Sequence, residues 1–166
     1  YLYSLKDDKF DSFTDLLYKI EEDRIVNSRQ LKILIQLQFF QFFGNNGKLL
    51  KIYELFNKLA NKKTIFKDKM DDYENYKELI KKYSEKETGK QFSKIDTKAI
   101  LKEIESTEPD DNIPIKEQMD FELDVLGHIN MTYDNIEKNI CYVLDIDTKY
   151  SPKLTLYSLG TGKEIV

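Results

Sequence analysis

"VNSRQLKILIQLQFFQFFGNNGKLLKIYELF", residues 26–56, is the densest apolar stretch of the chain and decides its fold. Its first half places leucine and isoleucine at helical spacing, with Asn27 or Ser28 as the N-terminal cap. Gly44 suits the end of that helix, because glycine adopts a left-handed conformation at little cost. The residues Asn45, Asn46 and Gly47 then predict a tight turn, and a second amphipathic helix follows it. The phenylalanines between the two helices are interpreted mainly as the packing that fixes them: Phe39, Phe40, Phe42 and Phe43.

The preceding residues repeat the pattern of an amphipathic helix. In "FDSFTDLLYKIEED" the apolar residues from Phe13 to Ile20 fall on one face, and Ser12 or Asp11 can cap the start. Three short amphipathic helices on short loops should pack as one compact unit. We therefore expect a helix-hairpin-helix-like helical unit over residues 1–60.

Residues 61–127 predict a helical connector that is Lys-rich and then acidic. A helix is expected in "MDDYENYKELIKKYSEK", another near Asp96, and a third from Pro114 to about Leu126, ended by Gly127. Residues 47–102 hold 15 Lys against nine acids, whereas residues 103–147 hold 13 acids against two Lys. A basic stretch can attract phosphate, although a solvated helix face explains it as well.

After Gly127 the pattern changes to short strands rich in β-branched and aromatic residues. "ICYVLDIDTKY", "KLTLYSL" and "GKEIV" are separated by turn residues and predict an antiparallel meander over residues 128–166. The expected fold class is mainly α with a C-terminal antiparallel β meander (α+β). We interpret the chain as a fragment of a longer polypeptide, since the last predicted strand is cut short.

Composition narrows the classes of protein. The 166 residues are 40% hydrophobic and 34% charged, and no apolar run approaches the roughly 20 residues that a membrane span needs. The single cysteine, Cys141, excludes an intrachain disulfide and a multi-cysteine zinc site. A cytoplasmic setting without membrane contact is the simplest expectation.

Residues with catalytic potential form no complete site in the sequence. Asp145 and Asp147 alternate along one predicted strand and share a face, so they could hold a divalent metal for phosphodiester chemistry, but the further acid such a site needs is not identifiable. "GTGK" lacks the other residues of a phosphate-binding loop and predicts a hairpin turn. The only histidine, His128, and Cys141 have no identifiable partners, so we expect no catalytic residue, metal or cofactor here.

Residues 10–56 resemble the bacterial replicative DNA polymerases of the C family, the DNA polymerase III alpha subunits. "VNSRQLKILI" matches the middle of the segment that follows the fingers in that family, Phe40 falls on its Phe and Gly44 on its closing Gly. At the position where the family has the glycine of its hairpin, this chain has Gln38. "PIKEQMDFELDVLG" resembles the family's later helix through Glu122, Leu126 and Gly127, and that helix precedes an OB-fold.

The resemblance implies a helix-hairpin-helix segment that leads into the start of an OB-like domain. It implies DNA replication as the process, with primer-template duplex or single-stranded DNA as the partner. The catalytic aspartates and Mg²⁺ of a DNA-directed DNA polymerase, a nucleotidyltransferase, would belong to a palm upstream of this fragment. Amides and amines near helix N-termini suit phosphate, which gives these candidate nucleic-acid contacts: Arg29, Lys32, Asn45, Asn46 and Lys48.

Two other functions remain open. The chain could be a protein-interaction or scaffold module whose acidic stretch, residues 103–124, docks a sliding clamp or another polymerase domain. It could also be a metal-dependent phosphodiesterase that uses Asp145 and Asp147. DNA titration at low and moderate salt would separate the DNA-binding function from the protein-interaction module, and metal-dependent hydrolysis of a nucleotide substrate would reveal the phosphodiesterase.

Overall fold

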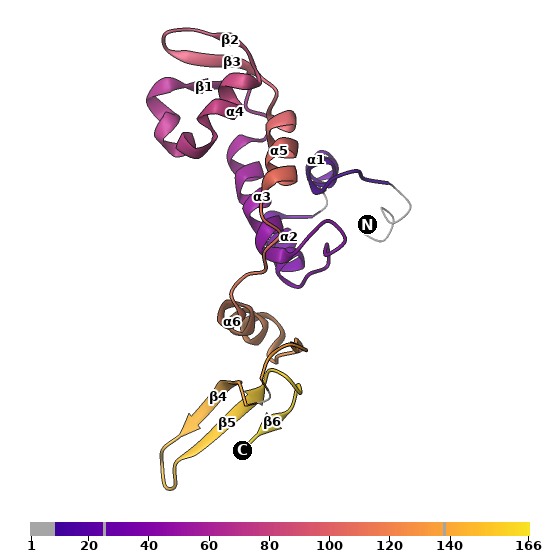
Figure 1. Cartoon of the computed structure of the whole chain (residues 1–166), viewed down its shortest axis with the longest axis vertical. Coiled ribbons are helices and arrows are strands. Elements are labelled where there is room, and N and C mark those ends of the chain that lie inside the picture. Colours follow the sequence, from indigo (N-terminus) through magenta and orange to yellow (C-terminus); the bar gives the residue numbers. More distant parts are fainter. Residues whose placement is uncertain (1–8, 25, 138) are drawn as a thin grey trace. The chain divides into compact units, whose positions relative to one another are not determined.

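A computed structural model describes residues 9–24, 26–137 and 139–166, and the chain divides into two compact units, Tyr1–Asn112 and Ile113–Val166. The boundary falls inside the expected connector 61–127. The expected α+β class with a C-terminal antiparallel meander is confirmed (Figure 1). Within the described residues, none of the helices has the length and apolar character needed to cross a bilayer.

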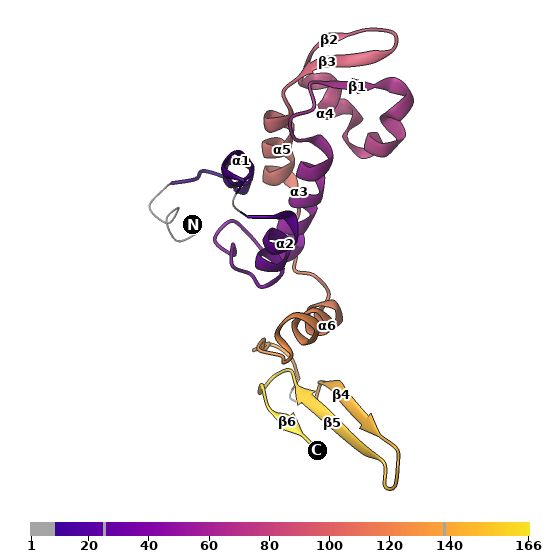
Figure 2. The same ribbon diagram turned by 180° about the vertical axis from the view of Figure 1, so that it is seen from behind.

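The first unit contains five α-helices, a 3₁₀ helix and a small sheet. In chain order its elements are α1 (Phe13–Asp23), α2 (Ser28–Gln36), α3 (Asn46–Leu59), β1 (Thr64–Phe66), η2 (Lys67–Tyr76), α4 (Lys77–Lys82), β2 (Ser84–Glu87), β3 (Gln91–Ile95) and α5 (Thr97–Thr107). Helix α3 is central: it contacts α1, α2 and α5, and nine of its 14 residues are buried (Figures 1 and 2). The three predicted helices therefore exist, and α5 completes their packing.

Side-chain caps explain where several of these helices begin. The Ser12 hydroxyl accepts from the Asp15 amide at α1, and the Asp96 carboxylate accepts from the Ala99 amide at α5. Asn27 and Gln30 form a reciprocal capping box at α2. Because each cap satisfies an amide that the helix leaves free, the first residues of these helices follow from short local patterns.

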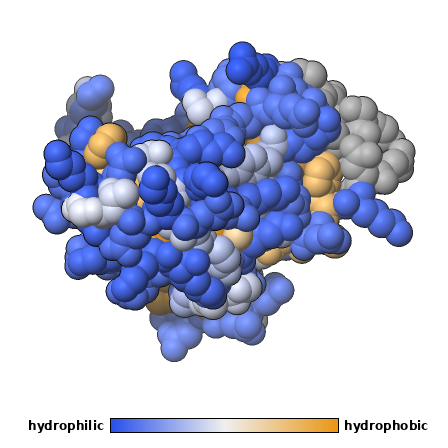
Figure 3. All heavy atoms as spheres, turned by 90° about the horizontal axis from the view of Figure 1, so that it is seen from above, coloured by the Kyte–Doolittle hydropathy of each residue, from blue (hydrophilic) through white to orange (hydrophobic). Residues whose placement is uncertain are grey.

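The connector differs most from its prediction. Residues 61–95 are not a polar helical linker but include an antiparallel sheet of order β1-β3-β2, in which Ile65 faces Phe92. The predicted helix over residues 70–86 is split into η2 and α4 and ends at Lys82, before β2. The residues that face the viewer in Figure 3 are largely hydrophilic.

The second unit pairs one helix with the predicted meander. Its elements are α6 (Ile115–Leu126), β4 (Cys141–Asp147), β5 (Lys153–Ser158) and β6 (Glu164–Ile165), with sheet order β4-β5-β6. Its core contains Met119, Ile129, Tyr157 and Leu159. The buried Glu122 carboxylate accepts from the amides of Asn130 and Met131, which joins α6 to the segment after it.

The sheet of the second unit has two unlike faces. Tyr142 and Tyr157 are paired on the face that packs on the core. Val143 is paired with Leu156 and Ile146 with Leu154 on the other face, where Val143, Ile146 and Leu154 are about half exposed. Gly162 has a φ of 65° in the turn between β5 and β6, so "GTGK" is a hairpin turn as predicted.

Candidate nucleic-acid interface

Helix α2 presents two of the predicted contacts to solvent. Leu31 and Ile35 are buried against the unit, whereas Arg29 and Lys32 are exposed. Residues three apart on a helix lie on the same side, so these two cations are neighbours. Neither takes part in an ion pair among the residues that the structure describes, so both charges face water.

Helix α2 ends earlier than predicted, at a left-handed glutamine. Gln38 has a φ of 58°, the Phe39 amide donates to the Leu34 carbonyl at 3.0 Å, and the Gln38 amide donates to the Ile35 carbonyl at 2.9 Å. This pair of bonds is a Schellman motif, in which the left-handed residue is usually glycine. The prediction that Gly44 ends α2 is therefore wrong. Gly44 instead has a φ of 146° and closes a series of turns over residues 37–44, which we call the hairpin.

The four phenylalanines of the hairpin divide into an inner and an outer pair. Phe40 and Phe43 pack on Phe13 of α1, with ring centroids 5.6 and 5.9 Å from it. Phe39 and Phe42 are 59% and 85% exposed. The interpretation of all four as packing is correct for the inner pair and wrong for the outer pair.

The N-terminus of α3 is covered by the chain's own acidic segment. The Asn45 amide donates to the Asp110 carboxylate at 2.7 Å, and the Asn45 side chain donates to the Asp110 carbonyl at 2.9 Å. The Lys48 amide donates to the Asp111 carbonyl at 3.0 Å. A carboxylate is favoured there because the helix dipole and free amides attract negative charge.

This arrangement corrects the prediction of an exposed Asn45-Asn46 turn. Asn46 is the first residue of α3, is 1% exposed, and its side chain donates to the Gln36 carbonyl. Asn45 already has the aspartate partner described above. Lys48 is partly exposed, so of the five candidates only Arg29, Lys32 and Lys48 offer charge to a partner.

The acidic stretch 103–124 is largely engaged within its own units. Glu105 is buried and accepts from the Phe13 and Thr14 amides at the start of α1. Glu108 pairs with Lys51 at 2.7 Å and Glu103 with Lys82 at 2.6 Å. The stretch predicted as a docking surface for a clamp therefore serves mainly as internal capping and pairing.

A feature that the sequence prediction missed is a long run without acids. From Arg24 to Tyr53 the chain has five cations and no Asp or Glu, and both of its arginines lie in this run. The run contains α2, the hairpin and the start of α3. The absence of Asp and Glu over 30 successive residues is the signal in the sequence that would have identified this run.

Two side chains have strongly shifted pKa values. Burial raises the pKa of the Asp15 carboxyl, but hydrogen bonds from Lys102, Lys98 and Ser12 outweigh it and lower this pKa to about 2. A hydrogen bond to the Asp120 carboxylate, together with burial, raises the pKa of Tyr142 to about 12. Both groups hold elements together: Asp15 joins α1 to α5, and Tyr142 joins β4 to α6.

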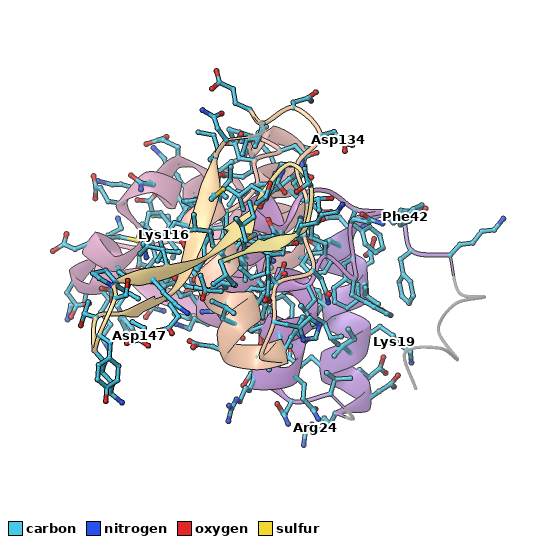
Figure 4. All side chains as sticks on the ribbon, turned by 90° about the horizontal axis from the view of Figure 1, so that it is seen from below. Lys19, Arg24, Phe42, Lys116, Asp134 and Asp147 are labelled. Atoms are coloured by element: carbon cyan, nitrogen blue, oxygen red, sulfur yellow. The ribbon has the colours of Figure 1, made fainter. Side chains whose placement is uncertain are left out.

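The residues with catalytic potential stay apart. Asp145 and Asp147 are exposed, and the Asp147 carboxylate accepts from the Lys149 amide (Asp147 is labelled in Figure 4). His128 contacts the Leu126 carbonyl through Nδ1, and Cys141 is a free thiol of intermediate exposure. Over the described ranges, no three His, Cys, Asp or Glu side chains come together as metal ligands.

The arrangement can therefore offer exposed cations and aromatic rings to a partner from α2 and the hairpin. Comparison of the chain with known protein families, with curated proteins and with solved structures gives no match.

Proposed function

We propose that the chain is a non-catalytic DNA-binding segment of a bacterial replicative DNA polymerase III alpha subunit, which positions the primer-template duplex. In this proposal α2, the hairpin and α3 form the helix-hairpin-helix, and α6 leads into an OB-like domain that begins with β4, β5 and β6. The partner is DNA, and the chemistry of nucleotide transfer belongs to a palm outside this chain.

The observation that carries the proposal concerns three backbone positions. Gln38, Gly44 and Gly127 stand where the resembled family has its hairpin glycine, its closing glycine and the glycine after its later helix. All three have positive φ, at 58°, 146° and 75°. Positive φ is the conformation for which glycine is favoured. The turn geometry thus supports the resemblance even at Gln38, where the side chain differs.

Two further features support the proposal. The order of elements, a helix pair, a later helix that ends at Gly127 and then an antiparallel meander, is the order that the resemblance implies. Glu122, one of the residues on which the resemblance rests, is 1% exposed and binds the two amides that follow α6.

The proposed contacts are the free cations rather than the amides of α3. Asp110 occupies the N-terminus of α3, so phosphate contact falls to Arg29, Lys32 and Lys48. Neutralising two to three phosphates gives a salt slope of about −1.8 to −2.7. Affinity should therefore fall by about 10- to 40-fold between about 50 and 200 mM salt.

Fluorescence anisotropy with labelled primer-template DNA tests this function. The double variant Arg29→Glu and Lys32→Glu should bind more weakly and with a shallower salt slope. The matched control is Lys69→Glu with Lys77→Glu, two exposed lysines on η2 and α4, and it should lose less affinity. The function is refuted if the unchanged chain shows no binding at low salt, and the residue assignment is refuted if both double variants behave alike.

The alternative function is a protein-interaction or scaffold module that docks a clamp or another polymerase domain. Its acidic surface is reduced to the carboxylates that have no internal role, such as Glu117 and Asp124 on α6. The absence of DNA binding at low salt would favour this alternative, whereas DNA binding that survives the Arg29 and Lys32 reversals would refute only the residue assignment.

A further inference from the structure

We propose that Phe39 and Phe42, the outer phenylalanines of the hairpin, stack on unpaired bases of single-stranded DNA. This inference rests on the proposed DNA binding and adds a second mode of contact to it. The phosphate contacts of α2 would then be joined by base contacts immediately after α2 along the chain.

Each outer ring contacts an inner ring but stays exposed to solvent. Phe39 meets Phe40 edge to face at 5.2 Å, and Phe42 meets Phe43 in the same way at 5.0 Å. Phe40 and Phe43 are in turn packed on Phe13. An edge-to-face contact restricts the orientation of the outer ring and leaves at least one of its π-faces outside that contact.

The two exposed rings are three residues apart in the chain. The Gln41 amide donates to the Gln38 carbonyl and the Phe43 amide to the Phe40 carbonyl, so this part of the hairpin turns with bonds between residues three apart. Both rings are exposed on this short segment, and Phe42 is labelled in Figure 4.

The surrounding charge favours a nucleic acid over an apolar protein partner. The hairpin lies inside the acid-free run from Arg24 to Tyr53, which carries five cations. The Asp110 carboxylate lies beside Gly44 at the end of the hairpin, and it is already bound to the Asn45 amide at the start of α3. Exposed aromatic rings next to uncompensated cations are the combination by which single strands are bound without sequence preference.

The test compares strands of equal charge. The full chain is titrated with a labelled oligothymidylate of about 12 nucleotides, within the usual span of a single-strand site. A second strand has the same phosphates but abasic residues at its centre, and a short duplex reports on the proposed function alone. The variant Phe39→Leu with Phe42→Leu removes both rings but keeps apolar side chains. Its matched control is Phe66→Leu, a half-exposed ring on β1.

We expect the Phe39 and Phe42 double variant to bind the oligothymidylate at least about 25-fold more weakly, because each of the two lost base-ring stacks contributes about fivefold or more. The abasic strand should show a comparable loss with the unchanged chain. Duplex affinity, and the affinity of the Phe66→Leu control for every strand, should not change.

Each other result overturns the inference in a distinguishable way. Equal affinity for the abasic and intact strands means that phosphate contact alone binds the strand. An unchanged affinity of the leucine variant, with a loss only in Phe39→Ser and Phe42→Ser, means an apolar contact rather than stacking. Duplex binding without single-strand binding refutes the stacking and leaves the proposed function standing, whereas binding to neither refutes both.

Discussion

The buried carboxylate of Glu105 offers the most direct test of how the first unit is held together. Glu105 on α5 is 8% exposed and accepts three hydrogen bonds at the start of α1: from the Phe13 amide at 2.7 Å, the Thr14 amide at 2.9 Å and the Thr14 hydroxyl at 2.6 Å. These residues lie 91 or 92 positions apart in the chain. The substitution Glu105→Gln keeps the shape of the side chain but replaces one acceptor oxygen with a donor.

The expected cost follows from the lost bonds and the lost charge. A hydrogen bond to a charged group contributes about 1.5–3 kcal/mol, and a negative charge at a helix N-terminus about 0.3–1 kcal/mol more. Since glutamine is less costly to bury than a carboxylate, part of this loss is offset. We expect Glu105→Gln to lower the free energy of unfolding by about 2–3 kcal/mol.

Urea denaturation followed by far-UV circular dichroism measures this change. The matched control Glu74→Gln alters an exposed residue of η2 and should shift stability by less than about 0.5 kcal/mol. Thr14→Val removes one of the three donors, so the two substitutions should be non-additive by about 1 kcal/mol in a double-mutant cycle. The reasoning is refuted if Glu105→Gln stays within about 0.5 kcal/mol of the unchanged chain, or if the two substitutions are additive.

Three further substitutions test single features by the same denaturation. Because the pKa of Asp15 is lowered from 3.8 to about 2 in the fold, the ionised carboxylate stabilises the fold at pH values above about 3.8, by about 1–2 kcal/mol after solvent screening of the lysines. This contribution is lost as the pH falls towards 2, so Asp15→Asn should flatten the decline of stability below about pH 4. Gln38→Gly should raise the free energy of unfolding by about 0.5–1 kcal/mol, because it relieves the left-handed strain at φ 58°, and an unchanged or lowered value would contradict that conformation. Gly47→Ala would place a Cβ 2.5 Å from the Asp111 carbonyl oxygen and should cost about 1–3 kcal/mol, so a neutral result would show that residues 108–112 do not lie against α3.

The sequence predicted those elements whose signals are local. The caps at Ser12, Asn27 and Asp96 and the break at Gly127 are each visible within a few residues, and the structure confirms the helices that they begin or end. The meander was predicted for the same reason, since its strands are successive and separated by turn residues.

The elements that were missed depend on distant partners. The three-residue strand β1 pairs with β3, so Thr64 faces Ser93, and neither strand shows a clear alternation of apolar and polar residues. Strands as short as these are recognised only through the sheet that they join. The early end of α2 was missed for a different reason, because glutamine at position 38 gives no sign that the backbone turns left-handed there.

The candidate site was predicted least well, because the number of charged residues in a stretch of sequence does not show which of them form ion pairs within the fold. The excess of lysine in residues 47–102 and the excess of acid after residue 103 are opposite in sign, and folding brings part of them together: Lys51 meets Glu108, and Lys82 meets Glu103. Helix N-termini take up Glu105 and Asp110 in addition. Such internal pairing uses part of the charge of both blocks, although many lysines of residues 47–102, such as Lys69 and Lys77, stay exposed.

The run from Arg24 to Tyr53 differs from both blocks because it contains no acid of its own. Within it Lys51 is paired, whereas Arg29 and Lys32 have no ion pair in the described part of the chain. Cations without a neighbouring acid attract an anionic partner, so we propose DNA contact at α2 and the hairpin rather than at residues 47–102 or 103–147. A function argued from charge therefore has to start from cations that have no ion pair and no acid close by in the chain. Arg29 and Lys32 are such cations, and they precede the exposed rings of Phe39 and Phe42 along the chain.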